Sequence, residues 1–288
     1  MEKLHIGTCS WKYPSWAGLV YSAPTGIDYL REYAQKYTTV EIDQWFWSLF
    51  EGGKVQLPKT TDVESYARAV PKSFTFTIKA PNSVSLTHPY QGASDGPVAA
   101  NPFFLSAAVM RDLYERLEPL REQIGMLFLQ FEYLNRQKMA SQQQFQQRVQ
   151  EFRAQLPAGP PLGLEIRNST WLNATFFEFL LAAGIHPVLL QGYWMPPVTQ
   201  VYEKHRALIV RHPTLMLRLM GADRQGIEKE AAGSWDRVLW SKEQELLGIA
   251  EMIRDILAAG VELYVNINNH YEGSAPRTIA RLLELLDV

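Results

Sequence analysis

Residues 162–190 read LGLEIRNSTWLNATFFEFLLAAGIHPVLL, and this stretch contains a complete strand–helix–strand unit. Two short apolar runs, at 162–167 and 186–190, have the length and composition of buried strands. Between them, residues 170–183 form an amphipathic run that is long enough for a helix. Two strands that are joined through a helix normally pair in parallel with a right-handed crossover. The segment therefore indicates an α/β fold.

The same alternation continues along the chain on both sides of this unit. Eight candidate strands occupy residues 4–8, 39–42, 74–79, 126–131, 162–167, 186–190, 215–219 and 263–268. Amphipathic runs that predict helices lie between most of them, at 29–37, 102–117, 141–156, 170–183, 242–259 and 275–286. Eight such strands in a chain of 288 residues are typical of a (β/α)8 barrel. We therefore predict the α/β class and a single-domain TIM-like (β/α)8 barrel that spans residues 1–288. An open doubly wound sheet is the alternative, but no Gly-rich phosphate-binding fingerprint follows the first strand.

The composition is that of a folded protein with a large core. Hydrophobic residues make up 47% of the chain, charged residues 20%, and the formal net charge is −2. A chain of this length buries about 75% of the surface that its unfolded form exposes, so it needs no metal or disulfide to fold. The near-neutral charge argues against a general polyanion binder. The eight tryptophans, four of them within the first 47 residues, require a separate explanation.

The sequence also bears on the cellular compartment of the protein and on its contact with membranes. The sole cysteine, Cys9, excludes an intrachain disulfide and a zinc site built from cysteines. A reducing cytoplasm is the natural setting for such a chain. The first residues lack an apolar stretch of signal-peptide length, and no window has the roughly 18 apolar residues of a membrane span. We expect a cytoplasmic protein without a membrane partner.

Three passages rich in Pro and Gly, at 91–102, 157–163 and 221–233, predict loops. The first is long and follows a strand, which is where barrel enzymes build the walls of their active sites. The second lies near the middle of the chain and joins a helix directly to a strand. We interpret it as an ordinary loop and not as a linker between two domains.

Polar residues recur near the C-terminal ends of the predicted strands. Because side chains alternate across a strand, Glu41 shares a face with Asp43, and Glu165 shares one with Arg167. The same parity groups Thr75, Thr77 and Lys79 on the third strand, and Tyr264, Asn266 and Asn268 on the eighth, while Arg218 lies on the seventh. Parallel strands are normally apolar on both faces, so this pattern predicts a polar pocket at the C-terminal mouth of the barrel. The alternative is an ionic network that fills the barrel and binds nothing.

Several motifs occur in a fixed order over nearly the whole chain. They are Gly7-Thr8-Cys9-Ser10-Trp11, Val40-Glu41-Ile42-Asp43, Lys79, Thr87-His88, Glu165-x-Arg167 followed by Trp171, Arg218-Leu219-x-Gly221 and Asn268-Asn269. With these motifs the chain resembles the YecE-like family, which is catalogued as domain of unknown function 72. The resemblance implies a single TIM-like barrel domain and no particular reaction, since the family's activity is not established.

The chain departs from the family pattern at three places. Asp43 stands where the family commonly has Asn, which adds a negative charge beside Glu41. Met220 stands where the family commonly has His, and residues 130–133 read Gln-Phe-Glu-Tyr in place of the usual Gln-Leu-Pro-Pro. The loss of that histidine puts in doubt whether a reaction common to the family is retained here.

Glu41 and Glu165 are the candidate acid and base. On strands two and five they would face one another across the barrel mouth, and paired carboxylates with separated pKa values can act as general acid and general base. Lys79 or Arg167 nearby would keep one of them ionised. The alternative is that Glu165–Arg167 and Glu41–Lys79 are structural ion pairs.

Histidine and metal chemistry form a further set of hypotheses. His88, in the long loop after the third strand, is the best histidine candidate for proton transfer at neutral pH. Endonuclease-type barrels bind several divalent ions through many His and carboxylate ligands, and this chain lacks the dense histidine set that such a cluster needs. A single divalent ion, held by some of Glu41, Asp43, Glu165, His88 and His270, is compatible with the sequence, but no cofactor is required.

The predicted binding residues combine charge, amides and aromatic rings. Arg167 and Arg218 have the planar fork that suits carboxylate and phosphate ligands. Trp11, Trp45 and Trp171 follow strands and are placed to stack on a flat ligand, whereas Trp16 and Trp47 are interpreted as caps on the core. The remaining members of the predicted set are Asp43, Asn268 and Asn269.

The leading hypothesis is an enzyme, of the hydrolase, lyase or isomerase type, that acts on a small polar or anionic ligand. It predicts that Glu165→Gln removes activity and leaves thermal stability nearly intact, whereas unfolding of this variant would indicate a structural ion pair. The alternative is a nucleic-acid binding or processing protein, by analogy with apurinic endonuclease barrels, in which Lys204, Arg206 and Arg211 meet the phosphates. A non-catalytic interaction protein is a third hypothesis.

Overall fold

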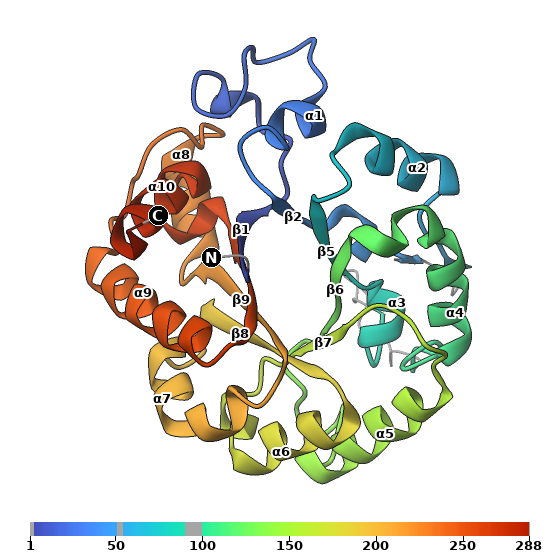
Figure 1. Cartoon of the computed structure of the whole chain (residues 1–288). Helices are drawn as coiled ribbons and strands as arrows, with labels where there is room; N and C mark the ends of the chain where they lie inside the picture. Colours follow the sequence, from blue (N-terminus) through green and yellow to red (C-terminus); the bar gives the residue numbers. More distant parts are fainter. Residues whose placement is uncertain (1–2, 51–53, 90–99, 288) are drawn as a thin grey trace.

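The computed structural model describes residues 3–50, 54–89 and 100–287. Eight parallel strands close into a barrel in the order β1-β10-β9-β8-β7-β6-β5-β2, and helices surround it (Figure 1). The strands are β1 Leu4–Cys9, β2 Thr39–Ile42, β5 Thr75–Lys79, β6 Ile124–Gln130, β7 Leu162–Glu165, β8 His186–Gly192, β9 Thr214–Gly221 and β10 Glu262–Ile267. Each coincides with a predicted strand to within two residues at either end. The predicted α/β class and TIM-like barrel are confirmed.

The helices agree with the sequence prediction less completely. Six match predicted runs, namely α1 Tyr29–Tyr33, α4 Ala107–Arg116, α5 Gln142–Gln155, α6 Ala174–Ala183, α9 Glu243–Ala258 and α10 Ala275–Leu286. Four were not predicted, namely α2 Thr60–Ala69, α3 Asn82–Ser85, α7 Val198–Ile209 and α8 Arg224–Ala231. The segment 221–233, expected as a loop, thus contains α8, which begins where the Asp223 side chain accepts a hydrogen bond from the Gly226 amide. Most of the other expected loop, 91–102, lies outside the described residues.

Smaller elements connect these parts. The chain after β2 forms a short antiparallel pair, β3 Leu49–Phe50 with β4 Lys54–Val55, which the sequence did not predict. Within the described ranges, no helix combines the length and the apolar character that crossing a membrane requires.

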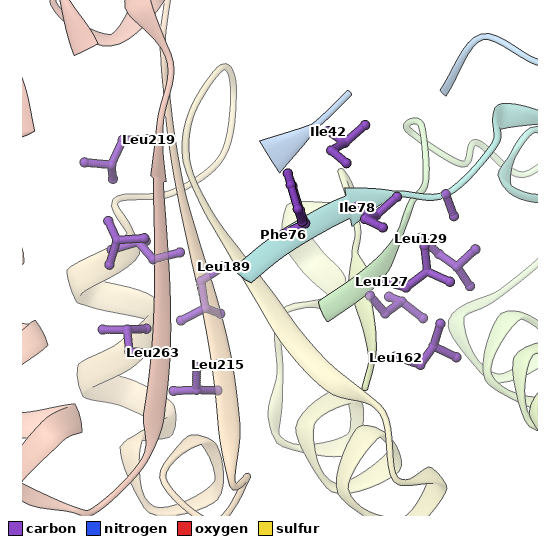
Figure 2. Close-up of a cluster of buried hydrophobic side chains, with 14 of the residues drawn as sticks. Ile42, Phe76, Ile78, Leu127, Leu129, Leu162, Leu189, Leu215, Leu219 and Leu263 are labelled. Atoms are coloured by element: carbon purple, nitrogen blue, oxygen red, sulfur yellow. The ribbon is translucent and has the colours of Figure 1, made fainter. Parts of the chain in front are cut away.

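The main core lies between the strands and the helices. Figure 2 shows the side chains that the strands direct outward into it, among them Ile42, Phe76, Ile78, Leu127, Leu129, Leu189, Leu215, Leu219 and Leu263. These side chains are almost completely buried. Burying one of them contributes about 1.5–3 kcal/mol to the free energy of folding, so this shell is the main contribution to the packing of the helices against the barrel.

The interior of the barrel changes from apolar to polar along its axis. Nearer the N-terminal ends of the strands, Met126, Phe128, Val188, Met216 and Tyr264 form a separate buried cluster. Above it, toward the C-terminal ends, the inward side chains are polar and equally buried, namely Glu41, Thr77, Glu165, Arg218 and Asn266. The apolar cluster therefore closes the barrel from below, and any ligand must enter from the C-terminal mouth.

Gly192 and Gly221 allow strands β8 and β9 to end close together at this mouth, because a Cβ at Gly192 would lie 2.3 Å from the carbonyl oxygen of Gly221. Gly221 has φ +79°, and a Cβ there would lie 2.1 Å from the carbonyl oxygen of His270. Gly26 has nearly the same φ, +77°, but open space around its Cα. Gly221→Ala combines a left-handed alanine with a backbone clash, so we expect it to lower the free energy of unfolding by about 2–5 kcal/mol.

Gly26→Ala is the matched control, because it carries the conformational cost without the clash, about 1–2 kcal/mol. Urea unfolding of the two variants measures both costs. Equal losses in the two variants would mean that the close approach of Gly221 to the segment at His270 is not a real constraint on the mouth.

Candidate functional site

A cavity of about 540 Å³ opens at the C-terminal ends of the strands. Six of the sequence-predicted site residues line it, namely Asp43, Lys79, Arg167, Arg218, Asn268 and Asn269. They come from β2, β5, β7, β9 and β10 or from the residues that directly follow these strands. The cavity falls in the size range of small-molecule sites.

Arg218 is the central charge on the floor of the cavity. Its guanidinium binds Glu41 through two hydrogen bonds, Nε to Oε2 at 2.8 Å and Nη2 to Oε1 at 2.7 Å. Its Nη1 donates to Oε2 of Glu165 at 2.5 Å. The Arg218 side chain is 2% exposed and both carboxylates are 0% exposed. One arginine therefore holds two carboxylates that come from opposite sides of the barrel.

The remaining carboxylate oxygens are also engaged. Oε1 of Glu165 accepts from Nε of Arg167 at 2.9 Å, and Oε2 of Glu41 accepts a longer bond from the Asn266 amide at 3.4 Å. Burial raises the pKa of Glu165, but the charges of Arg218 and Arg167 outweigh it, so the pKa lies below its usual value. Glu165 is therefore a fixed anion at neutral pH.

These contacts correct the predicted acid–base pair. Glu41 and Glu165 do not face one another across an open mouth, because both bind Arg218, which lines the cavity, and neither glutamate lines it. The ion pair Glu165–Arg167, which the sequence offered as the alternative, is present. Glu41 pairs with Arg218 and not with Lys79.

Lys79 lies in an unusual setting for a lysine. Its Nζ lies 3.6 Å from the centre of the Phe46 ring, and among the described residues no carboxylate lies within ion-pair distance of it. Burial, together with the like charge of Arg218, lowers the pKa of Lys79 to about 8. Asp43 faces the same cavity, and burial and the neighbouring charge of Glu41 raise its pKa.

Amide groups from the end of β10 supply further donors. Oδ1 of Asn269 accepts from the Ala275 backbone amide at 2.9 Å, which fixes the orientation of the side chain. Its Nδ2 is buried and has no hydrogen-bond partner among the described residues. Oδ1 of Asn268 likewise accepts from the backbone, here from His270 at 2.9 Å. Both side chains line the cavity.

A smaller charged group closes one side of the cavity. Glu228 accepts a hydrogen bond from Nε of Arg224 at 2.8 Å and lies 3.1 Å from Nε2 of His270. Burial and the neighbouring charge of Arg224 lower the pKa of His270. The Arg224 side chain is 63% exposed, against 21% for Arg167, so Arg167 and Lys79 are the less hydrated candidates to meet a ligand.

A second, less polar chamber of about 430 Å³ adjoins the first. Arg167 and Tyr193 line both, and the Arg167 guanidinium lies 4.5 Å from the centre of the Tyr193 ring. Tyr133 and Trp194 line the second chamber and are strongly exposed, at 64% and 92%. The sequence did not identify this chamber.

The tryptophan predictions need correction. Trp11 and Trp45 pack against the ring of Tyr66, with centroids 5.2 and 5.4 Å apart, and Trp171 packs against Phe145 at 5.5 Å. None of these three lines the main cavity. Trp47, interpreted from the sequence as a core cap, lines the cavity and is 61% exposed, whereas Trp16 is buried as expected.

The structure also differs from the sequence-based expectations for His88 and for a metal ion. His88 lies 3.0 Å from the hydroxyl of Thr87, through Nδ1, and does not line the cavity. Within the described ranges, no three His, Cys, Asp or Glu side chains come together in a way that could hold a metal ion. The single divalent ion that the sequence left open thus has no ligand set in this part of the chain.

Comparison with known proteins identifies the family. The model of the family "Protein of unknown function DUF72" matches residues 5–288. The chain belongs to the DUF72 family. This confirms the resemblance to the YecE-like family that the motifs indicated.

Individual relatives of this DUF72 chain are distant in sequence. It is 22% identical over 278 residues to the UPF0759 protein YunF of Bacillus subtilis strain 168, covering 90% of this chain and 86% of that protein. A DUF72 protein from Enterococcus faecalis V583 has a similar structure, with a TM-score of 0.70 and 17% identity over 99% of this chain and 96% of that one. One from Thermotoga maritima MSB8 has a TM-score of 0.66 and 21% identity, covering 99% of both chains. These likenesses show a shared fold and name no reaction.

Proposed function

We propose that this DUF72 protein is an enzyme whose substrate is a small anionic molecule, bound at the C-terminal mouth of the barrel. The observation that carries the proposal is a set of hydrogen-bond donors that line the cavity and lack acceptors of their own. The amine of Lys79 belongs to this set, whereas the Nδ2 of Asn269 has no partner among the described residues but is itself buried. The terminal nitrogens of Arg167 also belong to this set of donors, because Arg167 binds Glu165 through its Nε alone.

Donors without acceptors favour a ligand that is rich in acceptors. Buried polar groups are nearly always paired, and leaving one unpaired costs about 1–3 kcal/mol. A carboxylate or phosphate group offers the acceptor oxygens that would satisfy Lys79 and Arg167. Arginine also binds such groups through two parallel hydrogen bonds, which fixes their orientation.

The buried ion network supports the same proposal. Arg218 is satisfied by Glu41 and Glu165, so it is not available as the main ligand contact. Both carboxylates are engaged in the same network, which leaves Asp43 and Glu228 as the carboxylates that line the cavity, and Glu228 is already bound to Arg224 and His270. The finer proposal of Glu41 and Glu165 as acid and base is therefore replaced. They hold Arg218 and Arg167 in position, and proton transfer falls to Lys79 and Asp43, whose pKa values are shifted toward neutrality.

Inorganic phosphate is the probe for this anion site. At low ionic strength we expect millimolar phosphate to raise the Tm of the wild type by several degrees, because a ligand that binds the folded state stabilises it by mass action. Lys79→Met is expected to lose most of this shift. Differential scanning calorimetry with and without phosphate, at constant ionic strength, makes the measurement.

Lys72→Met is the matched control. Lys72 is exposed and lies just before β5, at the opposite end of the strand from Lys79. Its removal changes the net charge equally and should leave the phosphate shift intact. An unchanged phosphate shift in Lys79→Met would remove the anion site from the cavity.

Nucleic-acid binding gains no support from the basic residues that suggested it. Arg206 is paired with Asp255 through two hydrogen bonds, at 2.5 and 2.8 Å. Arg211 lies in the loop that leads to the start of β9, at the opposite end of the barrel from the cavity. No observation therefore favours this second function.

A further inference from the structure

Lys79 combines three features that are rarely found together in a lysine. Its amine lines a cavity, it has no carboxylate within ion-pair distance among the described residues, and it lies over an aromatic ring. It stands at the last position of β5, so a rigid strand and not a flexible loop sets the position of the side chain. A lysine that served only as a structural charge would be stabilised more by a carboxylate within ion-pair distance.

We propose that Lys79 is a nucleophile that forms an imine with the carbonyl carbon of a ligand that also bears a carboxylate or phosphate group. This inference rests on the proposed anion site, because that site would bring the carbonyl carbon to the amine. The substrate class is thus an oxo acid or a phosphorylated aldehyde or ketone. No such ligand is assigned by the family to which the chain belongs.

The environment of Lys79 supports a nucleophilic role. Desolvation and a neighbouring cation are the two means by which proteins activate a lysine amine, and here burial and the guanidinium of Arg218 supply them. The face of the Phe46 ring acts in the other direction, because it attracts the protonated form. With a pKa of about 8, roughly a tenth of the amine is neutral at pH 7, against roughly one part in 3,000 for an ordinary lysine. The gain in reactive amine is thus about 300-fold.

The charged groups around Lys79 act in both directions. Arg218 lowers its pKa, while Glu41, Glu165 and Asp43 raise it. The two glutamates are already bound to Arg218, which weakens their hold on the lysine. Binding of an anion would add a negative charge and raise the pKa, so the carbonyl must reach the amine while it is neutral.

The covalent step balances without a further reactant. The lone pair of Nζ attacks the carbonyl carbon, a C–N bond forms, and the carbonyl oxygen takes up a proton to give a carbinolamine. The C–O bond then breaks, the oxygen leaves as water after a second proton is delivered, and a protonated imine remains once nitrogen has lost one proton. Asp43, which lines the same cavity and has a raised pKa, is the candidate to shuttle these protons.

Reductive trapping tests the proposal on the full, unmodified chain. The probe is glyoxylate, which carries an aldehyde next to a carboxylate, in the presence of cyanoborohydride, which reduces an imine to a stable secondary amine. Peptide mass spectrometry then compares the rate of modification at Lys79 with that at the exposed Lys72. We expect Lys79 to be modified at least tenfold faster and phosphate to slow its modification selectively.

A neutral aldehyde of similar size, propanal, tests the role of the anion. Selectivity for Lys79 should be at least severalfold lower with propanal than with glyoxylate. Equal rates at Lys79 and Lys72 with glyoxylate would overturn the imine proposal. Fast modification of Lys79 that is equal for both aldehydes and insensitive to phosphate would overturn the substrate class.

The two experiments together distinguish a failure of the imine proposal from a failure of the proposed function. A phosphate-dependent rise in Tm without selective trapping would leave the anion site in place and remove the imine. Loss of both signals would remove the function together with the inference. The experiment needs no variant that might fail to fold, because it is performed on the wild-type protein.

Discussion

Arg218→Met is expected to lower the free energy of unfolding by about 3–5 kcal/mol, which corresponds to a fall in Tm on the order of 10 °C. The variant would leave Glu41 and Glu165, both completely buried, without the guanidinium that binds them. Methionine fills a similar volume, so the loss measures the uncompensated carboxylates more than a cavity. Urea unfolding at pH 7 is the measurement.

The triple variant Arg218→Met, Glu41→Gln, Glu165→Gln is the control for this result. It removes the two carboxylates together with the arginine, so we expect it to recover a large part of the lost stability. Protonation should act in the same direction, and the single variant should be less destabilised at pH 5 than at pH 7. A triple variant that is no more stable than Arg218→Met would show that the loss comes from packing and not from charge.

The same network reverses the sequence-based expectation for Glu165→Gln. That expectation was a loss of activity with thermal stability nearly intact. Because Glu165 accepts from both Arg218 and Arg167, the variant should instead lose about 1–3 kcal/mol. The pKa of Glu165 is lowered in the folded state, so its contribution is present above the unfolded-state pKa, near 4.5, and is lost as the pH falls through the folded-state pKa.

Lys79→Met is expected to stabilise the ligand-free protein by about 1–3 kcal/mol at pH 7. The pKa of Lys79 falls from 10.5 to about 8 on folding, so a protonated Lys79 costs folding energy at neutral pH. Between pH 8 and 10.5 the unfolded chain binds more protons than the folded one, and the stability of the wild type therefore rises with pH across this window. The cost is fully present below pH 8.

Chemical unfolding of both proteins at pH 7 and at pH 10, in buffers without phosphate, checks this prediction. The advantage of Lys79→Met should be largest at pH 7 and should shrink at the higher pH. Subtracting the two proteins cancels the titration of groups that they share. A variant that is less stable than the wild type at pH 7 would mean that Lys79 is a structural charge and not a group held ready for a ligand.

The barrel could be predicted from the sequence because strand parity is a local property. The alternation of apolar and polar residues in Val40-Glu41-Ile42-Asp43 places Glu41 on the inner face without any knowledge of its partners. The same reasoning brought Lys79, Arg167 and Asn268 to the mouth, and all three line the cavity. Strand parity does not show how far each residue lies below the mouth of the barrel.

The pairing of charges could not be predicted in the same way. Arg218 lies 177 residues from Glu41 and 53 from Glu165, so nothing in local spacing connects them. The pair Glu165–Arg167 is only two residues apart and was foreseen as an alternative. Their shared contact with Arg218 is what makes the two glutamates partners in a buried ion network and not a candidate acid and base.

The errors for Trp11 and Trp45 have one cause. Both pack on Tyr66, which belongs to α2, a helix that the sequence analysis did not identify. Val63 is the buried residue of that helix, and its other positions are largely polar, so few apolar residues mark the segment as a helix that packs on the core. Without α2, the two tryptophans had no packing partner and were interpreted as walls of the pocket.

The protonation of Lys79 is the most direct test of the central claim that this cavity holds an activated amine at an anion site. NMR of protein that carries [ε-¹³C]lysine follows each amine as the pH is raised, and the resonance missing from Lys79→Arg identifies Lys79. We predict that this resonance titrates near pH 8 and that phosphate moves its titration to higher pH. A Lys79 resonance that titrates with the ordinary lysines, near pH 10.5, and does not respond to phosphate would contradict the account.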